Sequence, residues 1–257
     1  MVNKRHRLQA AMALLAMGYI GSGFAHARHL HHHYHHHVNT VSQTQTQATS
    51  VTPISASNSS LIHTLVSQTD NLGSNVLQVG LTAYQNARAR GLDSRKMLTI
   101  IDYSKPSTSK RMWVIDLSRQ RVLFNTLVAH GKNSGDNYAT NFSNSPSSEE
   151  SSLGVFLTGN TYSGKHGISM RLLGLERGFN SNAYARAIVM HSADYVSEGG
   201  IFSRGRIGRS WGCPALDPRV EPQIVNTIKD GTLIVAYYPS HQWLSQSQFL
   251  RPVSSFA

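Results

Sequence analysis

The chain has 257 residues, of which 40% are apolar, and a formal net charge of +11 at pH 7. This apolar share can furnish a hydrophobic core, which excludes a wholly disordered chain, and the length suits one large domain with an accessory segment. The strong basic charge favours an anionic partner. The glycine-rich phosphate loop on which nucleotide chemistry depends does not occur in the sequence.

We interpret residues 1–27 as a secretory signal peptide. Lys4, Arg5 and Arg7 precede the apolar run LQAAMALLAMGYIGSGFA, and the pattern Ala-His-Ala predicts cleavage after Ala27. The alternative is a membrane anchor, but the run contains three glycines and is short for a bilayer span of ~20 residues. We therefore expect an exported protein in the periplasm or cell envelope. There the anionic partner would be cell-wall polymer, lipid head groups or surface glycans rather than nucleic acid.

Residues 28–59 are predicted to be a disordered linker. They begin with the histidine-rich tract RHLHHHYHHHVNT and continue with polar VSQTQTQATSVTPISASNSS, which has too little apolar surface to offset the entropy of ordering. The imidazoles of the tract, including His29 and His37, can bind zinc, copper or nickel. No cysteine or carboxylate accompanies them, so we expect adventitious divalent-metal binding and no catalytic metal or organic cofactor.

The hydrophobic periodicity changes along the rest of the chain. Residues 60–94 predict two short helices separated by DNLGSN, because apolar residues recur at helical spacing on both sides of it. From residue 95 the period becomes two, and a further short helix follows Pro218. Residues 95–257 therefore predict a mainly β (β-rich α+β) domain. The predicted strands are residues 97–104, 111–117, 121–131, 153–159, 168–175, 186–191 and 231–238.

Cys213 is the only cysteine of the chain. Exported proteins usually pair their cysteines, so a single one indicates an intermolecular bridge, an inert buried thiol or a reactive thiol. His191 ends a predicted strand and could take the proton of the thiol, whose thiolate is the nucleophilic form. Gly212 permits a tight turn that would point backbone amides at an oxyanion. Each residue taken singly is more often structural, and together they are consistent with acyl transfer.

Three arginines precede the cysteine. Arg204, Arg206 and Arg209 are expected to lower the pKa of the thiol and to attract a substrate that carries a carboxylate.

The segment IVMHSADYVSEGGIFSRGRIGRSWGCPAL resembles the catalytic domain of the murein L,D-transpeptidases, the YkuD-like family, in the branch that ends in Gly-Arg-Ser-x-Gly-Cys-Pro-Ala. The similarity extends upstream through LVAHGKNSG, FSNSPSSEESSLGVFLTG and TYSGKHGISMRLLGLERGFNSNAYAR, and covers about residues 97–240. The resemblance implies an L,D-transpeptidase-like β-sandwich with short flanking helices. It also implies that Cys213 is the nucleophile, His191 the general base, Ser210 a support for the histidine or the oxyanion site, and Gly212 the motif glycine.

Two positions depart from the better-known branch of that family. Ser192 replaces the glycine that follows the histidine, and Ala215 replaces an arginine two residues after the cysteine. Without that arginine the substrate carboxylate must be bound elsewhere, and we expect Arg209 or Arg206 to bind it.

The remaining candidate residues follow from their positions in the sequence. Trp211, His166 and Tyr162 are expected to line the substrate groove. Asp194 or Glu198 could orient His191, although a solvated loop is the simpler interpretation of both. Other polar residues are expected to have structural roles: His130, Asn180 and Arg186.

The resemblance implies that the enzyme acts on peptidoglycan stem peptides and that carbapenems acylate Cys213. The thiolate would attack the L-centre of meso-diaminopimelate in a tetrapeptide stem, release D-alanine and form a thioester that an amine resolves. Water as the acceptor would make the protein an L,D-carboxypeptidase. A sortase-like enzyme is disfavoured because its Thr-x-Thr-Cys context is absent. The alternative of another class is a non-catalytic module that binds the cell wall or sequesters metal through its histidine tract.

Overall fold

The structure is a computed structural model and describes residues 56–93, 95–164 and 167–251. The predicted signal peptide, the linker as far as residue 55, and His166 lie outside these ranges. The described part contains eight strands and several short helices, which confirms the mainly β fold class. None of its helices has the length and apolar character needed to cross a membrane.

Two helices precede the sheet, as the periodicity predicted. Helix α1 (Ala56–Val66) begins inside the predicted linker, and α2 (Ser74–Ala89) buries one face against the sheet. Gly80 marks the closest approach of α2 to the sheet, since a Cβ at this position would lie 2.6 Å from Cδ1 of Ile100. The buried residues of α2 recur three or four positions apart and therefore form one apolar face; they are Val76, Leu77, Gly80, Leu81, Ala83, Tyr84 and Ala87.

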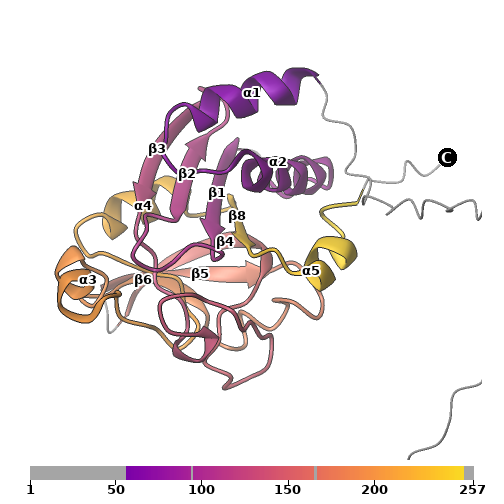
Figure 1. The fold of residues 1–257 in the computed structure, drawn as a ribbon. Helices are drawn as coiled ribbons and strands as arrows, with labels where there is room; N and C mark the ends of the chain where they lie inside the picture. The colour runs from indigo at the N-terminus through magenta and orange to yellow at the C-terminus, as the bar shows by residue number, and fades with distance from the viewer. Residues whose placement is uncertain (1–55, 94, 165–166, 252–257) are drawn as a thin grey trace, which may run out of the picture. The chain divides into compact units, whose positions relative to one another are not determined.

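All eight strands form one hydrogen-bonded sheet in the order β3-β2-β1-β8-β4-β5-β6-β7. The β1–β8 and β6–β7 pairs are parallel, and the other neighbours are antiparallel. The first three strands are upright in Figure 1, whereas β5 runs across the view, so the sheet turns strongly across its width. Its strands are β1 (Met97–Asp102), β2 (Met112–Asp116), β3 (Arg121–Thr126), β4 (Gly154–Gly164), β5 (Gly167–Gly174), β6 (Val189–Ser192), β7 (Ala215–Leu216) and β8 (Leu233–Tyr237).

Strand β3 is shorter than predicted because the chain changes partner after it. The predicted strand ran over 121–131, but pairing with β2 ends at Thr126. The backbone N–H of Ala129 then donates to the carbonyl of Ala215 at 2.9 Å, and Gly131 forms an isolated parallel bridge with Ser210. The apolar pattern therefore continues in extended chain, but the segment now lies beside the turn that carries the cysteine.

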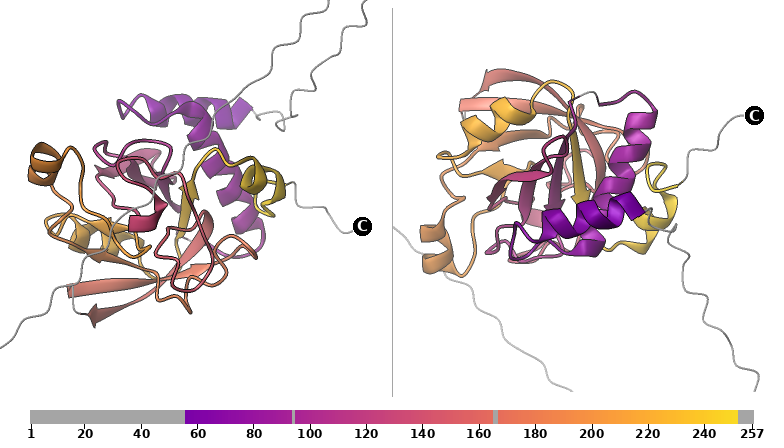
Figure 2. Two further views of the ribbon diagram at one scale, coloured as in Figure 1. Left: turned by 60° about the horizontal axis from the view of Figure 1, so that its bottom comes forward. Right: turned by 90° about the horizontal axis from the view of Figure 1, so that it is seen from above.

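Three helices follow in the second half: α3 (Glu198–Arg204), α4 (Glu221–Ile228) and α5 (His241–Gln246). Figure 2 shows α3 apart from the other helices, in the connection between β6 and β7. This helix was not predicted, because seven residues with two glycines show no apolar period. Its ends are defined locally: the Ser197 hydroxyl accepts from the Gly200 N–H at 3.3 Å, and Gly205 ends the helix at φ 70°.

Asn180 has the structural role that we expected. Its side chain is fully buried, donates to the Val155 carbonyl at 3.0 Å and accepts from the Glu176 N–H at 2.8 Å. The Glu176 carboxylate in turn accepts from the Val155 N–H at 2.7 Å and from the Trp243 indole at 3.1 Å. These bonds join β4, the chain after β5 and α5.

Candidate active site

The cysteine lies on a short turn that the Ser210 hydroxyl closes. This hydroxyl donates to the Cys213 carbonyl at 2.6 Å and accepts from the Gly212 N–H at 3.1 Å. The backbone of Ser210 is fixed as well, because its N–H donates to the His130 carbonyl at 2.9 Å. The Ser210 hydroxyl therefore shapes the turn that carries the thiol.

Gly212 is required for this turn. Its φ is 117°, a conformation that residues with a side chain rarely adopt. A Cβ would also lie 2.8 Å from the Glu150 carbonyl oxygen and 3.0 Å from Cδ1 of Ile188. The expectation of a tight turn before the cysteine agrees with this geometry.

The Cys213 thiol lies against the start of β6. The N–H of Val189 points at the sulfur with 3.4 Å between nitrogen and sulfur, and the thiol faces the Ala187 carbonyl at 3.9 Å. Burial raises the pKa of the Cys213 thiol, and the Val189 N–H and the positive charge of Arg186 oppose this only in part. The expectation of a lowered pKa is therefore wrong for this structure, in which desolvation outweighs the nearby positive charge.

Arg186 is the arginine whose charge acts on the thiol, and we had expected it only to pack. Its guanidinium donates to the carbonyls of Ser143 and Glu150 at 2.7 Å each, and to the hydroxyls of Ser152 at 2.7 Å and Ser148 at 2.9 Å. Arg186 thus holds the segment 143–152 beside the cysteine turn. Its partners lie 34 to 43 residues away in sequence, so no local pattern indicated this role.

Arg206 and Arg209 both contact an acidic residue of the chain. Asp136 lies 2.6 Å from Nε of Arg206 and 3.4 Å from Nη1 of Arg209. Arg209 also donates to the carbonyl of Gly135 at 2.9 Å. These arginines join the chain before the cysteine to the 132–136 segment. The structure gives no support to the expectation that they bind the substrate carboxylate.

His191 lies on β6 with its ring nearly buried, at 8% exposure. Its Nδ1 lies 2.8 Å from the carbonyl oxygen of Ser192. Because a carbonyl can only accept, Nδ1 carries the proton in this bond and Nε2 is the basic nitrogen of the neutral ring. The Ser192 carbonyl thus performs the orienting role considered for Asp194 or Glu198.

The sheet register brings the histidine and cysteine segments together. His191 pairs with Ala215 in the parallel β6–β7 ladder, and two residues earlier in each segment Val189 of β6 contacts Cys213 of the turn before β7. Two residues along a strand correspond to about 7 Å. His191 therefore lies on β6 two positions beyond Val189, the residue that the thiol of the cysteine turn contacts.

His130 is structural, as we expected. It is fully buried, and its Nδ1 accepts from Nη2 of Arg111 at 2.7 Å. Burial, together with the charge of Arg111, lowers the pKa of His130 to about 4. The ring is therefore neutral at pH 7, and its backbone carbonyl supports Ser210 as described above.

Two tyrosines beside the thiol have no counterpart in the sequence predictions. Burial raises the pKa of Tyr195 to about 12, and the negative charge that Cys213 carries as a thiolate adds to this. The pKa of Tyr103 is raised by the same two causes, against the opposing charge of Arg111. A Cβ on Gly208 would lie 2.4 Å from Cβ of Tyr195, so the glycine of the Gly-Arg-Ser motif allows this tyrosine to pack closely.

Of the three residues expected to line the substrate groove, the structure describes two. Trp211 is 73% exposed, and Nζ of Lys132 lies 5.3 Å from its ring centroid. Tyr162 on β4 is 38% exposed, with the guanidinium carbon of Arg171 at 4.8 Å from its ring centroid. His166 lies outside the described residues. Trp211 is part of the cysteine turn, whereas Tyr162 lies two strands from β6.

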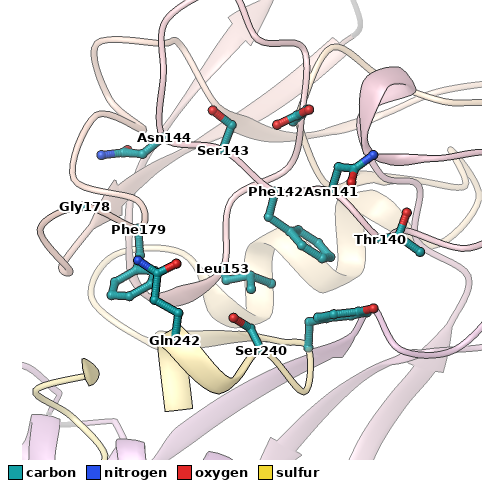
Figure 3. Close-up of a pocket in the computed structure, with 12 residues that line it drawn as sticks. Thr140, Asn141, Phe142, Ser143, Asn144, Leu153, Gly178, Phe179, Ser240 and Gln242 are labelled. Atoms are coloured by element: carbon teal, nitrogen blue, oxygen red, sulfur yellow. The ribbon is translucent and has the colours of Figure 1, made fainter. Parts of the chain in front are cut away.

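A pocket of about 530 Å³ borders the same 143–152 segment (Figure 3). Glu150 connects the two sites, because its carbonyl accepts from Arg186 while the residue lines the pocket. Figure 3 shows the Phe142 ring between Asn141 on one side and Gln242 on the other. Most lining side chains are aromatic, amide or hydroxyl, and Glu150 is the charged one, which suits a neutral polar ligand better than an anion. It comprises Thr140, Asn141, Phe142, Ser143, Asn144, Glu150, Leu153, Gly178, Phe179, Tyr238, Ser240 and Gln242.

Within the described ranges, no group of three or more histidine, cysteine or acidic residues is arranged to hold a metal ion. The histidine tract lies outside those ranges.

The sequence matches the L,D-transpeptidase catalytic domain over residues 68–237. The chain belongs to this family. The resemblance carried by the histidine and Ser-x-Gly-Cys segments is thereby confirmed at the level of the family. No curated protein matches the sequence of this L,D-transpeptidase domain.

Several solved L,D-transpeptidases are similar to the chain at low sequence identity. The L,D-transpeptidase from Mycobacterium smegmatis has 15% identity and a TM-score of 0.34, over 56% of this chain and 59% of its own. L,D-transpeptidase LdtMt1 in complex with imipenem has 15% identity and a TM-score of 0.35, over 55% and 59%. The L,D-transpeptidase from Stackebrandtia nassauensis has 13% identity and a TM-score of 0.34, over 71% and 91%. The chain thus spans about three fifths of the first two structures.

Proposed function

We propose that this L,D-transpeptidase domain is a peptidoglycan L,D-transpeptidase in which Cys213 transfers an acyl group from a tetrapeptide stem to an amine. The observation that carries the proposal is the placement of a partly buried thiol beside β6, the strand that also holds the oriented ring of His191. Membership of the family supplies the substrate class. We place the reaction in the periplasm or cell envelope, on the sequence evidence of residues 1–27.

The chemistry begins from a protonated thiol, because burial raises the pKa of Cys213. Nε2 of His191 accepts the thiol proton as the sulfur attacks the carbonyl carbon of the L-centre of diaminopimelate. The tetrahedral intermediate expels the amine of D-alanine, which takes the proton from the imidazolium and leaves a thioester on Cys213. The acceptor amine then attacks the thioester carbonyl and loses its proton to His191, and the thiol is restored.

Arg186 contributes to this cycle through the thiol. Its charge opposes the rise in the pKa of Cys213 and therefore favours the thiolate that forms as the proton moves to His191. Its four hydrogen bonds keep the 143–152 segment in contact with Gly212. The thiolate thus forms only with help from a base, which protects an exported thiol from indiscriminate oxidation.

The test is incubation of the chain without residues 1–27 with a purified disaccharide-tetrapeptide, followed by mass spectrometry. The expected products are free D-alanine, a thioester on the Cys213 peptide and a 3-3 cross-linked dimer. Cys213→Ala is the control and should give none of them. A tripeptide product without dimer would identify an L,D-carboxypeptidase, and the absence of both thioester and D-alanine would contradict the proposal.

The non-catalytic alternative predicts a different dependence on the histidine tract. A module that acts by binding metal or cell wall through this tract would lose its function on deletion of residues 28–55. The proposed enzyme should release D-alanine at an unchanged rate after the same deletion.

A further inference from the structure

Arg171 on β5 contacts two exposed aromatic rings. Its guanidinium carbon lies 4.8 Å from the ring centroid of Tyr162 and 5.3 Å from that of Tyr184. Both rings are well exposed, at 38% and 55%. A ring contacts the face of a guanidinium, so the in-plane N–H groups are left for hydrogen bonds. The two ring contacts therefore restrict the position of the guanidinium without using its donors in hydrogen bonds.

The sheet register places this cation on the same face as His191. Arg171 pairs with Val189, and Ser169 pairs with His191, in the antiparallel β5–β6 ladder. Directly paired residues share a face of the sheet, and so do residues two positions apart on one strand. Arg171 and His191 are therefore diagonal neighbours on adjacent strands, with about 7–8 Å between their backbones. Val189, the partner of Arg171, is also the residue whose N–H contacts the Cys213 sulfur. Arg171 thus lies one strand from the thiol.

Arg171 differs from the other arginines near the site in its electrostatic partners. Arg206 and Arg209 both contact Asp136, and Arg219 contacts Asp217 at less than 4 Å. The guanidinium of Arg186 is used on carbonyls and hydroxyls. Within residues 56–93, 95–164 and 167–251, Arg171 contacts no carboxylate and its side chain donates no hydrogen bond. It is an oriented cation with its donors available.

We infer that Arg171, stacked on Tyr162 and Tyr184, binds a carboxylate of the stem peptide, a role that rests on the function proposed above. The fork of a guanidinium matches the two oxygens of a carboxylate. An extended peptide advances about 3.3–3.6 Å per residue, so a carboxylate one to three residues from the reacting carbonyl reaches from the thiol to this cation. Arg171 takes the place of the arginine that Ala215 replaces in the motif.

The test compares wild type, Arg171→Gln and Arg171→Lys, with Arg121→Gln as the matched control. Arg121 is exposed on β3, at the opposite end of the sheet order from β6 and β7, and carries the same charge. Two readouts are measured: D-alanine release from the disaccharide-tetrapeptide, and calorimetric binding of that compound to each variant in a Cys213→Ala background. The second readout does not depend on turnover. A donor with its side-chain carboxylates amidated is measured in parallel.

Arg171→Gln should raise KM and the dissociation constant at least about tenfold while kcat changes less than about threefold, because binding and not chemistry is affected. The KM and dissociation constant of Arg171→Lys should lie between those of wild type and Arg171→Gln, because lysine keeps the positive charge but lacks the forked pair of donors. The amidated donor should bind wild type as weakly as the free donor binds Arg171→Gln. Equal dissociation constants for wild type and Arg171→Gln would overturn the inference. Binding that depends on Arg171 but forms no thioester would support the role of Arg171 and refute the proposed reaction. Absence of binding by the wild-type background would overturn both the role of Arg171 and the proposed function.

Discussion

The backbone N–H of Val189 points at the sulfur of Cys213, with 3.4 Å between the two atoms. The contact places the cysteine turn against β6, the strand that also carries His191 two residues further on and pairs with β7. In the proposed mechanism a thiol with a raised pKa needs a base, and His191 is the residue of β6 to which we assign that role.

Replacement of Arg186 should make the thiol harder to ionise. Arg186→Gln removes the positive charge that opposes the raised pKa of Cys213, so the midpoint of the pH–rate profile for iodoacetamide alkylation should move to higher pH. Arg204→Gln removes an equal charge from the exposed end of α3 and should leave the profile unchanged. An upward shift in Arg204→Gln alone would restore the original expectation from the sequence. Circular dichroism checks that each variant is folded.

Alanine at Gly212 should distort the cysteine turn. The positive φ of 117° and the 2.8 Å approach of a Cβ to the Glu150 carbonyl both oppose a side chain there. Gly212→Ala should lower the free energy of unfolding by about 2–4 kcal/mol and reduce thioester formation strongly. Gly199→Ala is the control, because its Cβ would meet only the Ser197 hydroxyl at 4.0 Å. Denaturant unfolding measures the stability of both variants, and equal unfolding free energies for Gly212→Ala and Gly199→Ala would contradict the role given to Gly212.

Glu221 should make stability depend on pH. The residue is buried at 2% exposure, its Oε1 has no hydrogen-bond partner, and burial raises its pKa to about 7. A carboxyl group with a higher pKa in the folded than in the unfolded state stabilises the fold fully below its unfolded pKa. That contribution is lost as the pH rises through about 7.

The unfolding free energy should therefore fall by on the order of 2 kcal/mol between pH 5 and pH 8 through this group. Glu221→Gln should remove this part of the pH dependence, while Glu198→Gln on the exposed first turn of α3 should keep it. Calorimetric melting temperatures at the two pH values provide the measurement. An unchanged pH dependence in Glu221→Gln would show that the carboxyl group titrates normally.

Loss of the base should affect the chemical step and not the fold. His191→Ala should reduce turnover by about 10² to 10⁴, the range for the loss of a positioned proton-transfer group. His241→Ala, at the exposed start of α5, is the matched control and should keep full activity. The measurement is the rate of D-alanine release by each variant. A fully active His191→Ala would contradict the assignment of His191 as the base.

The sequence was sufficient for those features that depend on local patterns. Apolar runs predicted every strand except the two-residue β7, and the histidine and the Ser-x-Gly-Cys segment indicated the family that the comparison confirms. Gly212 could be predicted because a glycine before a nucleophile has a direct conformational meaning.

The features that the sequence did not reveal depend on contacts between distant segments. Arg186 bonds to residues 34 to 43 positions away, and Asp136 pairs with Arg206 and Arg209 across 70 or more positions. The raised pKa of the thiol likewise follows from burial, which no local motif encodes. The sequence therefore indicated the family, whereas the contacts of Asp136 and Arg186 and the burial of the thiol had to come from the structure.

Acylation of Cys213 by a carbapenem tests the central claim most directly. The strained carbonyl of the inhibitor should react with a thiol that has a base beside it, and intact-protein mass spectrometry should show one adduct on the peptide that contains SWGCPAL. Cys213→Ser should form no adduct, because a serine hydroxyl is much harder to deprotonate than a thiol. A folded wild-type protein that remains unmodified by both the carbapenem and small thiol reagents would contradict the assignment of Cys213 as the nucleophile.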